Sequence, residues 1–578
     1  MSEETKRERQ IAKSLKDARH DWEGHYEQLE RNFLPRRGAF SEDPASKIRS
    51  DRGKLLNTSM LDSTPMRALR ILQSGLQAGI TSPSRPWFRL KLQGVDPELN
   101  ERKAVKQYLQ KAEHEMRRLM ERSGLYNMLH TGYGDLGVYG TEAAIIEDYS
   151  DYDLRGSQLV AGTYWLGMSD DRNVDTLYRE FNLTVNQIVG RFVFKGQRYS
   201  DPDWSVVPNR IMEMYDKGDI GKMETTAQLI VPRHDRYDGK MDGPNKPIAS
   251  KYWLRDDDRD MTKQRLLDNT GYSVNPISAS RWNVNGYEVY GTSPAMEALP
   301  DVKELMSKRR EYTELLKRMN RPPMNAHSDL RNSKFSLMPS AVNFMADPTK
   351  GLIPAYQTTP QLGPLADDIQ QSKDAVWSAM YADLFMMISQ LDRRQITATE
   401  IDERREEKLI ALGPVLERLH FEKLKPLVER LFNRVTSSGV LGPPPEELSD
   451  VDVDVDFVSM LAQAQKAVAT GGMERFAGYV GNLVAVDQNA IDKFDIDQSI
   501  DEYADMLGVP PSVVRSDDEV SAMREQRAEA QRVAMQNEQA VQATKAAQQG
   551  AQAAKVMSEA DSPRGQSPLD VLRQAGLG

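Results

Sequence analysis

Residues 397–435 contain the feature that most constrains the fold, two amphipathic helical patterns in a highly charged part of the chain. Thr397 and Glu400 have the spacing of a capping box, and Pro414 suits the first turn of a second helix, so a break is predicted at Gly413-Pro414. An apolar stripe at helical spacing follows, formed by Leu424, Leu427, Val428, Leu431 and Val435. The pattern favours a pair of long structural helices, and nothing in it is typical of catalysis.

The composition is polar for a chain of this length. The 578 residues are enough for about three or four domains, yet only 39% are hydrophobic and 28% are charged. Together with a mean hydropathy of −0.61, this balance favours long, thin helices or cores that neighbouring subunits complete. Cysteine is absent, which excludes disulfides, cysteine-ligated zinc, iron–sulfur clusters and a cysteine nucleophile.

Charge and hydropathy also limit the partners. No apolar run reaches the roughly 18 residues that span a bilayer, and the charged N-terminus lacks the apolar core of a signal peptide, so no membrane segment is predicted. The formal net charge is −10, whereas a protein that holds duplex DNA tightly is usually basic because phosphate contacts dominate its affinity. An acidic chain remains compatible with a channel through which DNA slides.

Local patterns divide the chain into helical and β regions. Helices are predicted over residues 11–33, 59–80, 98–130, 293–319, 365–391 and 517–560. Residues 143–290 favour β structure, with the clearest strands at 227–231 and 251–254. Residues 320–364 are proline-rich and lack periodicity, and a loop of that length is usually functional or disordered. Residues 561–578 are predicted to be disordered or to bind a partner.

Two apparent ligand-binding motifs have structural interpretations. Gly132 to Gly137 spell G-x-G-x-x-G, but the motif follows a predicted helix and precedes a predicted strand, the reverse of a dinucleotide site, so the glycines are interpreted as a tight helix-to-strand turn. Asp450 to Asp456 alternate aspartate and valine, but the run lacks the glycine and the final glutamate of a calcium loop. An edge strand with its aspartates facing solvent explains it better. Neither a metal nor any other cofactor is predicted.

One basic cluster is a candidate binding feature. Between Lys303 and Arg321 the chain has seven basic and only three acidic residues, an excess of four positive charges. One interpretation is ion pairing between packed subunits, and the other is a helix that lines a passage for a polyanion. In the second interpretation the candidates are Lys308, Arg309 and Arg310 on the helix and Arg331, Lys334 and Lys350 in the loop beyond it. Sparse cations on a loop would contact phosphates weakly, which suits movement better than retention.

Motifs of known catalytic chemistry are absent. The sequence contains no H-E-x-x-H, no Walker G-x-x-x-x-G-K-[ST] and no G-x-S-x-G, and its seven histidines are scattered. Paired carboxylates occur in helical charge runs, where a solvated face is the ordinary explanation. The chain is therefore predicted not to be an enzyme, although a triad assembled only in space would leave no local signature.

Four segments, in order along the chain, resemble the portal proteins of short-tailed bacteriophages, the head-to-tail connectors. They are NTSMLDSTP with the following SGLQAGITSPSRPWFRL (57–90), YGTSPAMEALPD (290–301), TATEI with RREEK and LGPVLERL (397–419), and FVSMLAQAQ (457–465). The resemblance covers residues 10–520 and is weakest in the C-terminal tail.

The resemblance implies a mainly α-helical subunit with a β-containing clip and wing, an α+β fold assembled as a ring of about twelve copies at one capsid vertex. The implied regions are an N-terminal wing (1–204), a β-rich clip (205–288), a stem helix (293–321), a tunnel loop (322–364), wing helices (365–440), a helical crown (441–560) and a tail (561–578). The Gln/Ala-rich part from Asp517 departs from the family pattern, so its form stays open.

The implied function is a structural channel for double-stranded DNA, passed without sequence specificity during packaging, retention and ejection. The implied partners are the major capsid protein and scaffold, the terminase large subunit, and tail adaptor and tail tube proteins, in the virion and in the host cytoplasm during assembly. Two alternatives remain: an internal scaffold or core protein without a channel, favoured by the Ala/Gln-rich helix, and a nucleic-acid enzyme, favoured only by the abundance of carboxylates.

Overall fold

The structure of the protein is a computed structural model. It describes residues 3–40, 60–92, 103–149, 153–195, 202–234, 240, 242–255, 266–332, 336, 338, 342, 344, 347, 351–355, 362–390, 411–445, 453–458, 476–483, 493–507, 514, 515 and 517–559. These residues form two compact units, Met1–Glu474 and Arg475–Gly578. Among the described helices, none is long and apolar enough to cross a membrane.

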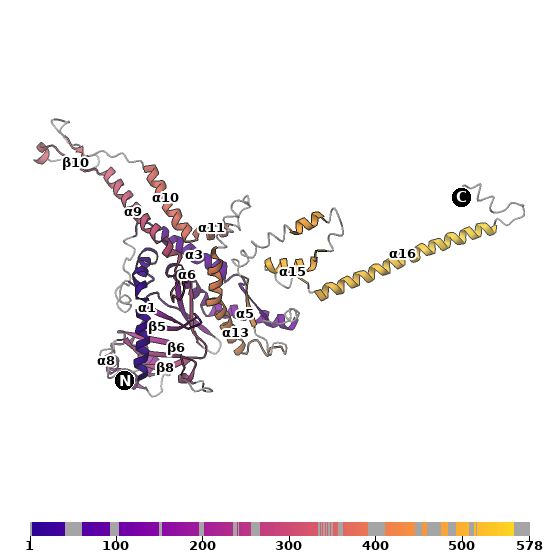
Figure 1. The fold of residues 1–578 in the computed structure, drawn as a ribbon, viewed down its shortest axis with the longest axis horizontal. Coiled ribbons are helices and arrows are strands. Elements are labelled where there is room, and N and C mark those ends of the chain that lie inside the picture. The colour runs from indigo at the N-terminus through magenta and orange to yellow at the C-terminus, as the bar shows by residue number, and fades with distance from the viewer. Residues whose placement is uncertain are drawn as a thin grey trace. The chain divides into compact units, whose positions relative to one another are not determined.

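The first unit contains most of the helices (Figure 1). They are α1 (Glu3–Phe33), α3 (Thr64–Ile80), α5 (Lys103–Arg122), α6 (Leu125–Tyr139), α7 (Val185–Ile188), α8 (Asn209–Asp216), α9 (Pro294–Asn320), α10 (Leu362–Ala379), α11 (Ala382–Gln390) and α13 (Lys425–Ser437). A π-helical turn, η7 (His420–Leu424), precedes α13. The second unit contains α15 (Ile496–Leu507) and the 43-residue α16 (Asp517–Glu559), whose described side chains are almost all exposed.

The described strands all pair antiparallel, in four sheets. They are β1 (Phe88–Leu92), β2 (Thr141–Asp148), β3 (Leu154–Gln158), β4 (Tyr164–Met168), β5 (Val174–Thr184), β6 (Met223–Pro232), β7 (Ile248–Leu254), β8 (Asp268–Tyr272), β9 (Ile277–Arg281), β10 (Met324–Asn325), β11 (Ile353–Pro354) and β12 (Val453–Phe457). The largest sheet has the order β4-β5-β6-β7-β8, and a second has the order β3-β2-β9. The predicted mixture of helices with β structure between residues 143 and 290 is confirmed.

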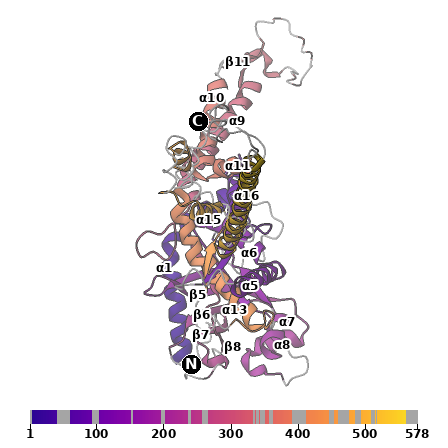
Figure 2. The ribbon, with the colours of Figure 1, turned by 90° about the vertical axis from the view of Figure 1, so that its right-hand side faces the viewer.

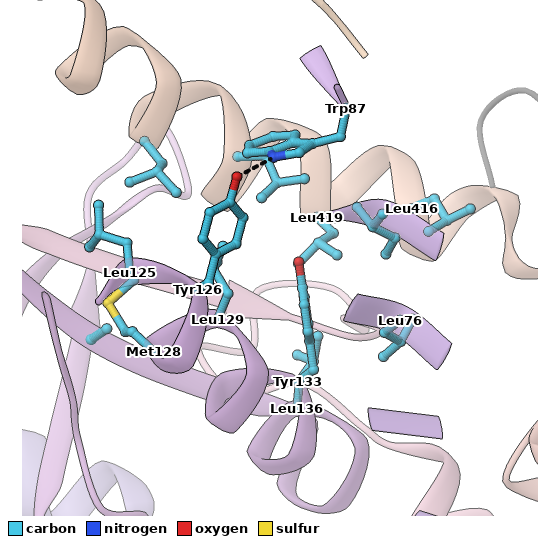
Figure 3. Packing of buried hydrophobic residues seen from close by; sticks show 14 of the residues in the cluster. Leu76, Trp87, Leu125, Tyr126, Met128, Leu129, Tyr133, Leu136, Leu416 and Leu419 are labelled. Atoms are coloured by element: carbon cyan, nitrogen blue, oxygen red, sulfur yellow. Dashed lines mark hydrogen bonds between the residues drawn. The ribbon is translucent and has the colours of Figure 1, made fainter. Parts of the chain in front are cut away.

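The main core surrounds α6. Its buried side chains pack with those of α3, α5 and the helical run before α13, as Figure 3 shows for Leu76, Tyr133 and Leu419. In the same core the Trp87 indole donates a hydrogen bond to the Tyr126 hydroxyl at 3.4 Å. The predicted apolar stripe from Leu424 to Val435 is confirmed, because its side chains are buried here.

The G-x-G-x-x-G motif lies inside α6, so its interpretation as a helix-to-strand turn is wrong. The turn is made by the next glycine, Gly140, which has φ +68°. The motif glycines instead allow close packing. A Cβ atom on Gly132 would lie 2.8 Å from Glu142 Oε2 and 2.9 Å from Lys423 Nζ, and one on Gly137 would lie 2.8 Å from Leu72. Glu142 and Lys423 form an ion pair in which both side chains are buried.

The predicted break at Gly413-Pro414 is also wrong. Residues 411–419 form one helical run that continues through η7 into α13. Leu412 and Leu416 are buried on either side of the Gly-Pro pair, so packing keeps the helix continuous there. The departure from α geometry comes later, in the π-helical turn. Thr397 and Glu400 lie outside the described residues.

Two predicted long helices are each divided in the structure. The region 98–130 is broken at Gly124, which has φ +65° between α5 and α6. The region 365–391 is broken at Tyr381, which has φ +53° between α10 and α11. Neither position carries a proline, so the sequence pattern predicted one continuous helix across each break.

The predicted edge strand of alternating aspartate and valine is confirmed as β12, which pairs antiparallel with β1. The Asp454 carboxylate accepts a hydrogen bond from Lys425 Nζ at 2.9 Å and another from the backbone N–H of Val455. These two bonds keep the pKa of Asp454 below its usual value. The carboxylate thus already accepts the hydrogen bond of the Val455 N–H, at the middle of the strand.

Helix α1 is attached to the five-stranded sheet partly by buried ion pairs. Glu180 on β5 accepts hydrogen bonds from Lys16 Nζ at 2.5 Å, from the Tyr178 hydroxyl at 2.7 Å and from Arg255 at 3.0 Å. Further along the helix, Glu8 pairs with Lys251. Burial alone would raise the pKa of Glu180, but the Lys16 ammonium and the hydrogen bonds lower it below its ordinary value. A carboxylate with a lowered folded-state pKa stabilises the fold above its unfolded pKa, and that contribution is lost as the pH falls through the folded pKa.

Replacing Glu180 with Gln should therefore lower the free energy of unfolding at neutral pH by about 1–3 kcal/mol. The loss should appear as a lower melting temperature. The difference from the parent should shrink as the pH falls below the usual glutamate pKa of about 4.3, because the parent carboxylate then loses its charge too. Melting curves across this pH range test the prediction, with Glu213→Gln, which removes an exposed carboxylate on α8, as the control. An unchanged gap at low pH would contradict the ion-pair explanation.

Gly140 and Gly124 offer a matched test of the turn after α6. Both have positive φ, but a Cβ atom on Gly140 would lie 2.2 Å from the Gly291 carbonyl oxygen, whereas nothing lies within 4 Å at Gly124. Gly124→Ala should cost about 1–2 kcal/mol of backbone strain. Gly140→Ala should cost about 3 kcal/mol or more, because a backbone contact must also shift. Thermal melting of the two variants compares their losses of stability. Equal losses would contradict the close backbone contact assigned to Gly140.

Candidate nucleic-acid interface

Helix α9, which carries the basic cluster, begins inside the core and then leaves it. The Ser293 hydroxyl accepts a hydrogen bond from the backbone N–H of Met296 at 3.1 Å and donates one to the carbonyl of Val138 at 2.6 Å, so the helix start is fixed against the end of α6. Pro300 lies within the helix, as predicted. The last buried side chain on α9 is that of Leu305. The following turns, which carry most of the basic residues, are therefore outside the core.

Helices α9 and α10 run side by side as an arm away from the core of the first unit (Figures 1 and 2). We define the arm as α9 beyond Leu305, α10, and the residues described between them. The short strands β10 and β11 pair beyond the ends of the two helices, and the Ala355 N–H donates to the Pro323 carbonyl at 2.8 Å. The arm thus consists of two helices joined by a loop region, and the basic cluster lies along α9.

Two of the candidate residues are engaged within the chain. Lys308 Nζ lies 2.8 Å from the Asp368 carboxylate and 3.0 Å from the Ser372 hydroxyl on α10, and it also pairs with Glu304. Arg309 Nε donates to Asp62 Oδ2 at 2.8 Å. The hydrogen bond to Asp368 is the main reason that the pKa of Lys308 is raised. Both cations join parts of the subunit, and their role as DNA contacts stays a prediction.

Arg310 belongs to an exposed stripe that extends beyond the candidates chosen from the sequence. Lys303, Arg310 and Lys317 are spaced by seven residues, which returns to nearly the same helix face. All three side chains are exposed, and Lys303 Nζ also donates to Gln28 on α1 at 2.6 Å. The seven-residue spacing was readable in the sequence, but the partners that engage Lys308 and Arg309 were not.

The loop candidates are only partly described. Arg331 lies in the short helical turn η5 (Ser328–Asn332) and is exposed. Lys334 and Lys350 lie outside the described residues. Nearby, Met338 and Phe344 are exposed, and Phe344 is 95% accessible. The role of Arg331, Lys334 and Lys350 as DNA contacts therefore stays a prediction.

The residues described here contain no group of three or more His, Cys, Asp or Glu side chains placed to hold a metal ion. The buried carboxylates of the first unit instead face cations of the same chain. Asp135, for example, accepts two hydrogen bonds from the Arg37 guanidinium at 3.0 and 2.8 Å. Burial still raises the pKa of Asp135 above its usual value.

Comparison with known proteins gives the family. The model of the family described as "Bacteriophage head to tail connecting protein" matches residues 5–514. A "Probable portal protein" of Bordetella phage BPP-1 is 36% identical over 540 residues, covering 93% of this chain and 94% of the relative. The "Portal protein" of Salmonella phage epsilon15 is 35% identical over 537 residues, covering 92% and 93%.

Among solved structures, a chain from a native gene transfer agent particle aligns with 81% of this chain and 94% of its own length, at 10% identity and a TM-score of 0.32. No conclusion rests on a likeness of that size. The family match and the two relatives, by contrast, span nearly the whole chain at substantial identity. The chain therefore belongs to the bacteriophage head-to-tail connecting proteins, the family of these phage portal proteins.

Proposed function

We propose that the chain is the portal subunit of a bacteriophage, which forms a ring-shaped channel at one capsid vertex for packaging, retaining and releasing double-stranded DNA. The observation that carries this proposal is the match to two portal proteins over more than nine tenths of this chain and of theirs. The net charge of −10 agrees with a conduit rather than a tight DNA binder, because a channel must let the duplex move.

The arm formed by α9 and α10 is our proposed channel element. Beyond Leu305 no side chain of α9 is buried, and the arm carries Arg310 and Lys317 of the exposed stripe there. Of the candidates, we place Arg310 and Arg331 first, because both are exposed. Lys334 and Lys350 join them by their position in the same loop region. A few separated cations would attract phosphates without fixing the duplex in one register.

The regional assignment is proposed with one adjustment. We retain 1–204 and 365–440 as wing, 205–288 as clip, 293–321 as stem, 322–364 as tunnel loop, 441–560 as crown and 561–578 as tail. The five-stranded sheet draws β4 and β5 from before residue 205, so the border between wing and clip is better placed upstream of Tyr164. The border between the two compact units, after Glu474, falls within the proposed crown.

We further propose that the ring has about twelve copies, is not an enzyme and takes no cofactor. Its proposed partners are the major capsid protein and scaffold during assembly in the host cytoplasm, the terminase large subunit during packaging, and tail adaptor and tail tube proteins afterwards. In this arrangement the energy for DNA movement comes from the docked motor, which agrees with the lack of a Walker motif in this sequence.

The proposed ring predicts a defined particle mass. Twelve copies of 65.4 kDa give about 785 kDa, so mass photometry of the purified protein should show a peak there, and imaging should show rings with a central hole. Open filaments would favour an internal scaffold instead. Absence of a ring both in solution and at the vertex of assembled capsids would contradict the proposal.

The proposed channel stripe predicts a charge effect on DNA. Changing Arg310 and Lys317 together to Gln should leave ring mass and melting temperature unchanged, because both side chains are exposed. The yield of DNA-filled particles should fall severalfold, because phosphate attraction along the arm is lost. The matched control changes Arg118 and Lys217 to Gln, which removes the same charge from exposed positions on α5 and after α8. Equal losses in both variants would point to net charge rather than the stripe.

A further inference from the structure

Asp62 is a buried carboxylate at the root of the arm. Its side chain is only 6% exposed, and it lies two residues before the start of α3. Its Oδ1 atom accepts hydrogen bonds from the backbone N–H of Thr64 at 2.9 Å and from the Thr64 hydroxyl at 2.5 Å. One carboxylate oxygen is thus committed to the first turn of a helix that belongs to the main core.

The other oxygen faces the arm. Asp62 Oδ2 accepts from Arg309 Nε on α9 at 2.8 Å, and Lys373 Nζ on α10 lies 3.7 Å away. A single carboxylate therefore meets a cation from each helix of the arm while it is held to α3. Its position near the positive end of α3 also favours the charged form. Burial alone would raise the pKa of Asp62, but the Thr64 hydrogen bonds and the Arg309 guanidinium lower it, so the group is ionised at neutral pH.

The contact lies where the arm leaves the core. Leu305 is the last buried residue of α9, four residues before Arg309. On α10 the buried residues are Ile369, Ser372 and Val376, which flank Lys373. The eleven residues of α9 beyond Arg309 span about 17 Å at 1.5 Å per residue, and none of them is buried. A rotation of about 10° at the root would move the far end of α9 by about 3 Å over that length.

We propose that Asp62 is the positioning residue of the arm: by holding Arg309 and Lys373 against the start of α3, it sets the direction in which the arm presents its cations to DNA. The proposal rests on the proposed function, because the arm has a DNA-directed role only if it lines the channel. Arg309 and Lys373 act through this contact and not by touching phosphate. Because Arg309 is paired with Asp62 and Arg310 is exposed, the two neighbouring arginines have different roles in this proposal.

The test compares cryo-electron microscopy structures of full-length rings. Asp62→Asn keeps the shape of the side chain and can still accept from Thr64, but it removes the charge that holds Arg309. Arg309→Gln removes the same contact from the partially exposed side, so it is a second route if the Asp62 variant folds poorly. Arg309→Lys retains the cation. Arg310→Gln, one residue along the helix, is the matched control for charge loss outside the contact.

In Asp62→Asn and Arg309→Gln rings, the arm should be displaced or smeared by several ångströms at its far end, while the body superposes on the parent. Arg309→Lys should restore most of the parent position, and Arg310→Gln should leave the arm in place. The double variant should move the arm no further than either single variant, because both remove one contact. An arm that keeps its parent position in Asp62→Asn and Arg309→Gln rings would overturn the proposal.

DNA measurements separate this proposal from the proposed function. In particles, Asp62→Asn should reduce DNA packaging or retention severalfold together with the displaced arm. If Arg310→Gln reduces DNA content while its arm stays in place, the channel role stands independently of Asp62. A displaced arm with normal DNA content in both variants would retain Asp62 as the holder of the arm but would refute the channel role of the arm.

Discussion

Helix α6 packs against α1, α3, α5 and α9 and against strands β2 and β3, and its glycines allow these neighbours to come close. One such close approach surrounds Gly132, where the ion pair of Glu142 and Lys423 occupies the space that a side chain would need. A buried ion pair is costly unless its geometry is good and its remaining lone pairs are satisfied. Here Glu142 also accepts hydrogen bonds from Ser280 at 2.7 Å and Gln158 at 3.0 Å. The arm depends on this packing, because the Ser293 hydroxyl holds the start of α9 against the end of α6.

Much of the fold was predictable from the sequence. Periodicity located α1 and α9, and the helix-favouring composition located α16. The Ser293-Pro294 pair marked the start of α9 correctly because cap chemistry is local. Short runs of strand-favouring residues located β6 and β7, and alternation located β12. The predictions failed where tertiary packing decides whether a helix continues. The motif glycines and the Gly413-Pro414 pair both look like breaks, but their neighbours are buried on both sides, and the helix persists.

The candidate site was predictable only in outline. The excess of basic residues between Lys303 and Arg321 is plain in the sequence, but the division of labour among them is not. Lys308 and Arg309 face α10 and α3, whereas Arg310 faces outward, and that difference depends on which side of α9 is covered. Asp62 lies more than two hundred residues upstream of Arg309, so no local pattern could connect the two. Charge composition therefore left both ion pairing and a polyanion partner open, and it did not show how the arm is held.

Among the residues that the structure describes, β12 pairs on one side only, with β1, and the other edge has a consequence for a subunit before assembly. A ring must be built from chains that exist separately first, and an open strand edge invites pairing with any other extended chain. The Asp454 carboxylate already accepts a hydrogen bond from the Val455 N–H and is held by Lys425. A strand that approached this edge would therefore meet a negative charge and an N–H group that is already hydrogen-bonded. The Asp454 carboxylate is therefore placed to disfavour pairing between the β12 edges of separate subunits before they assemble.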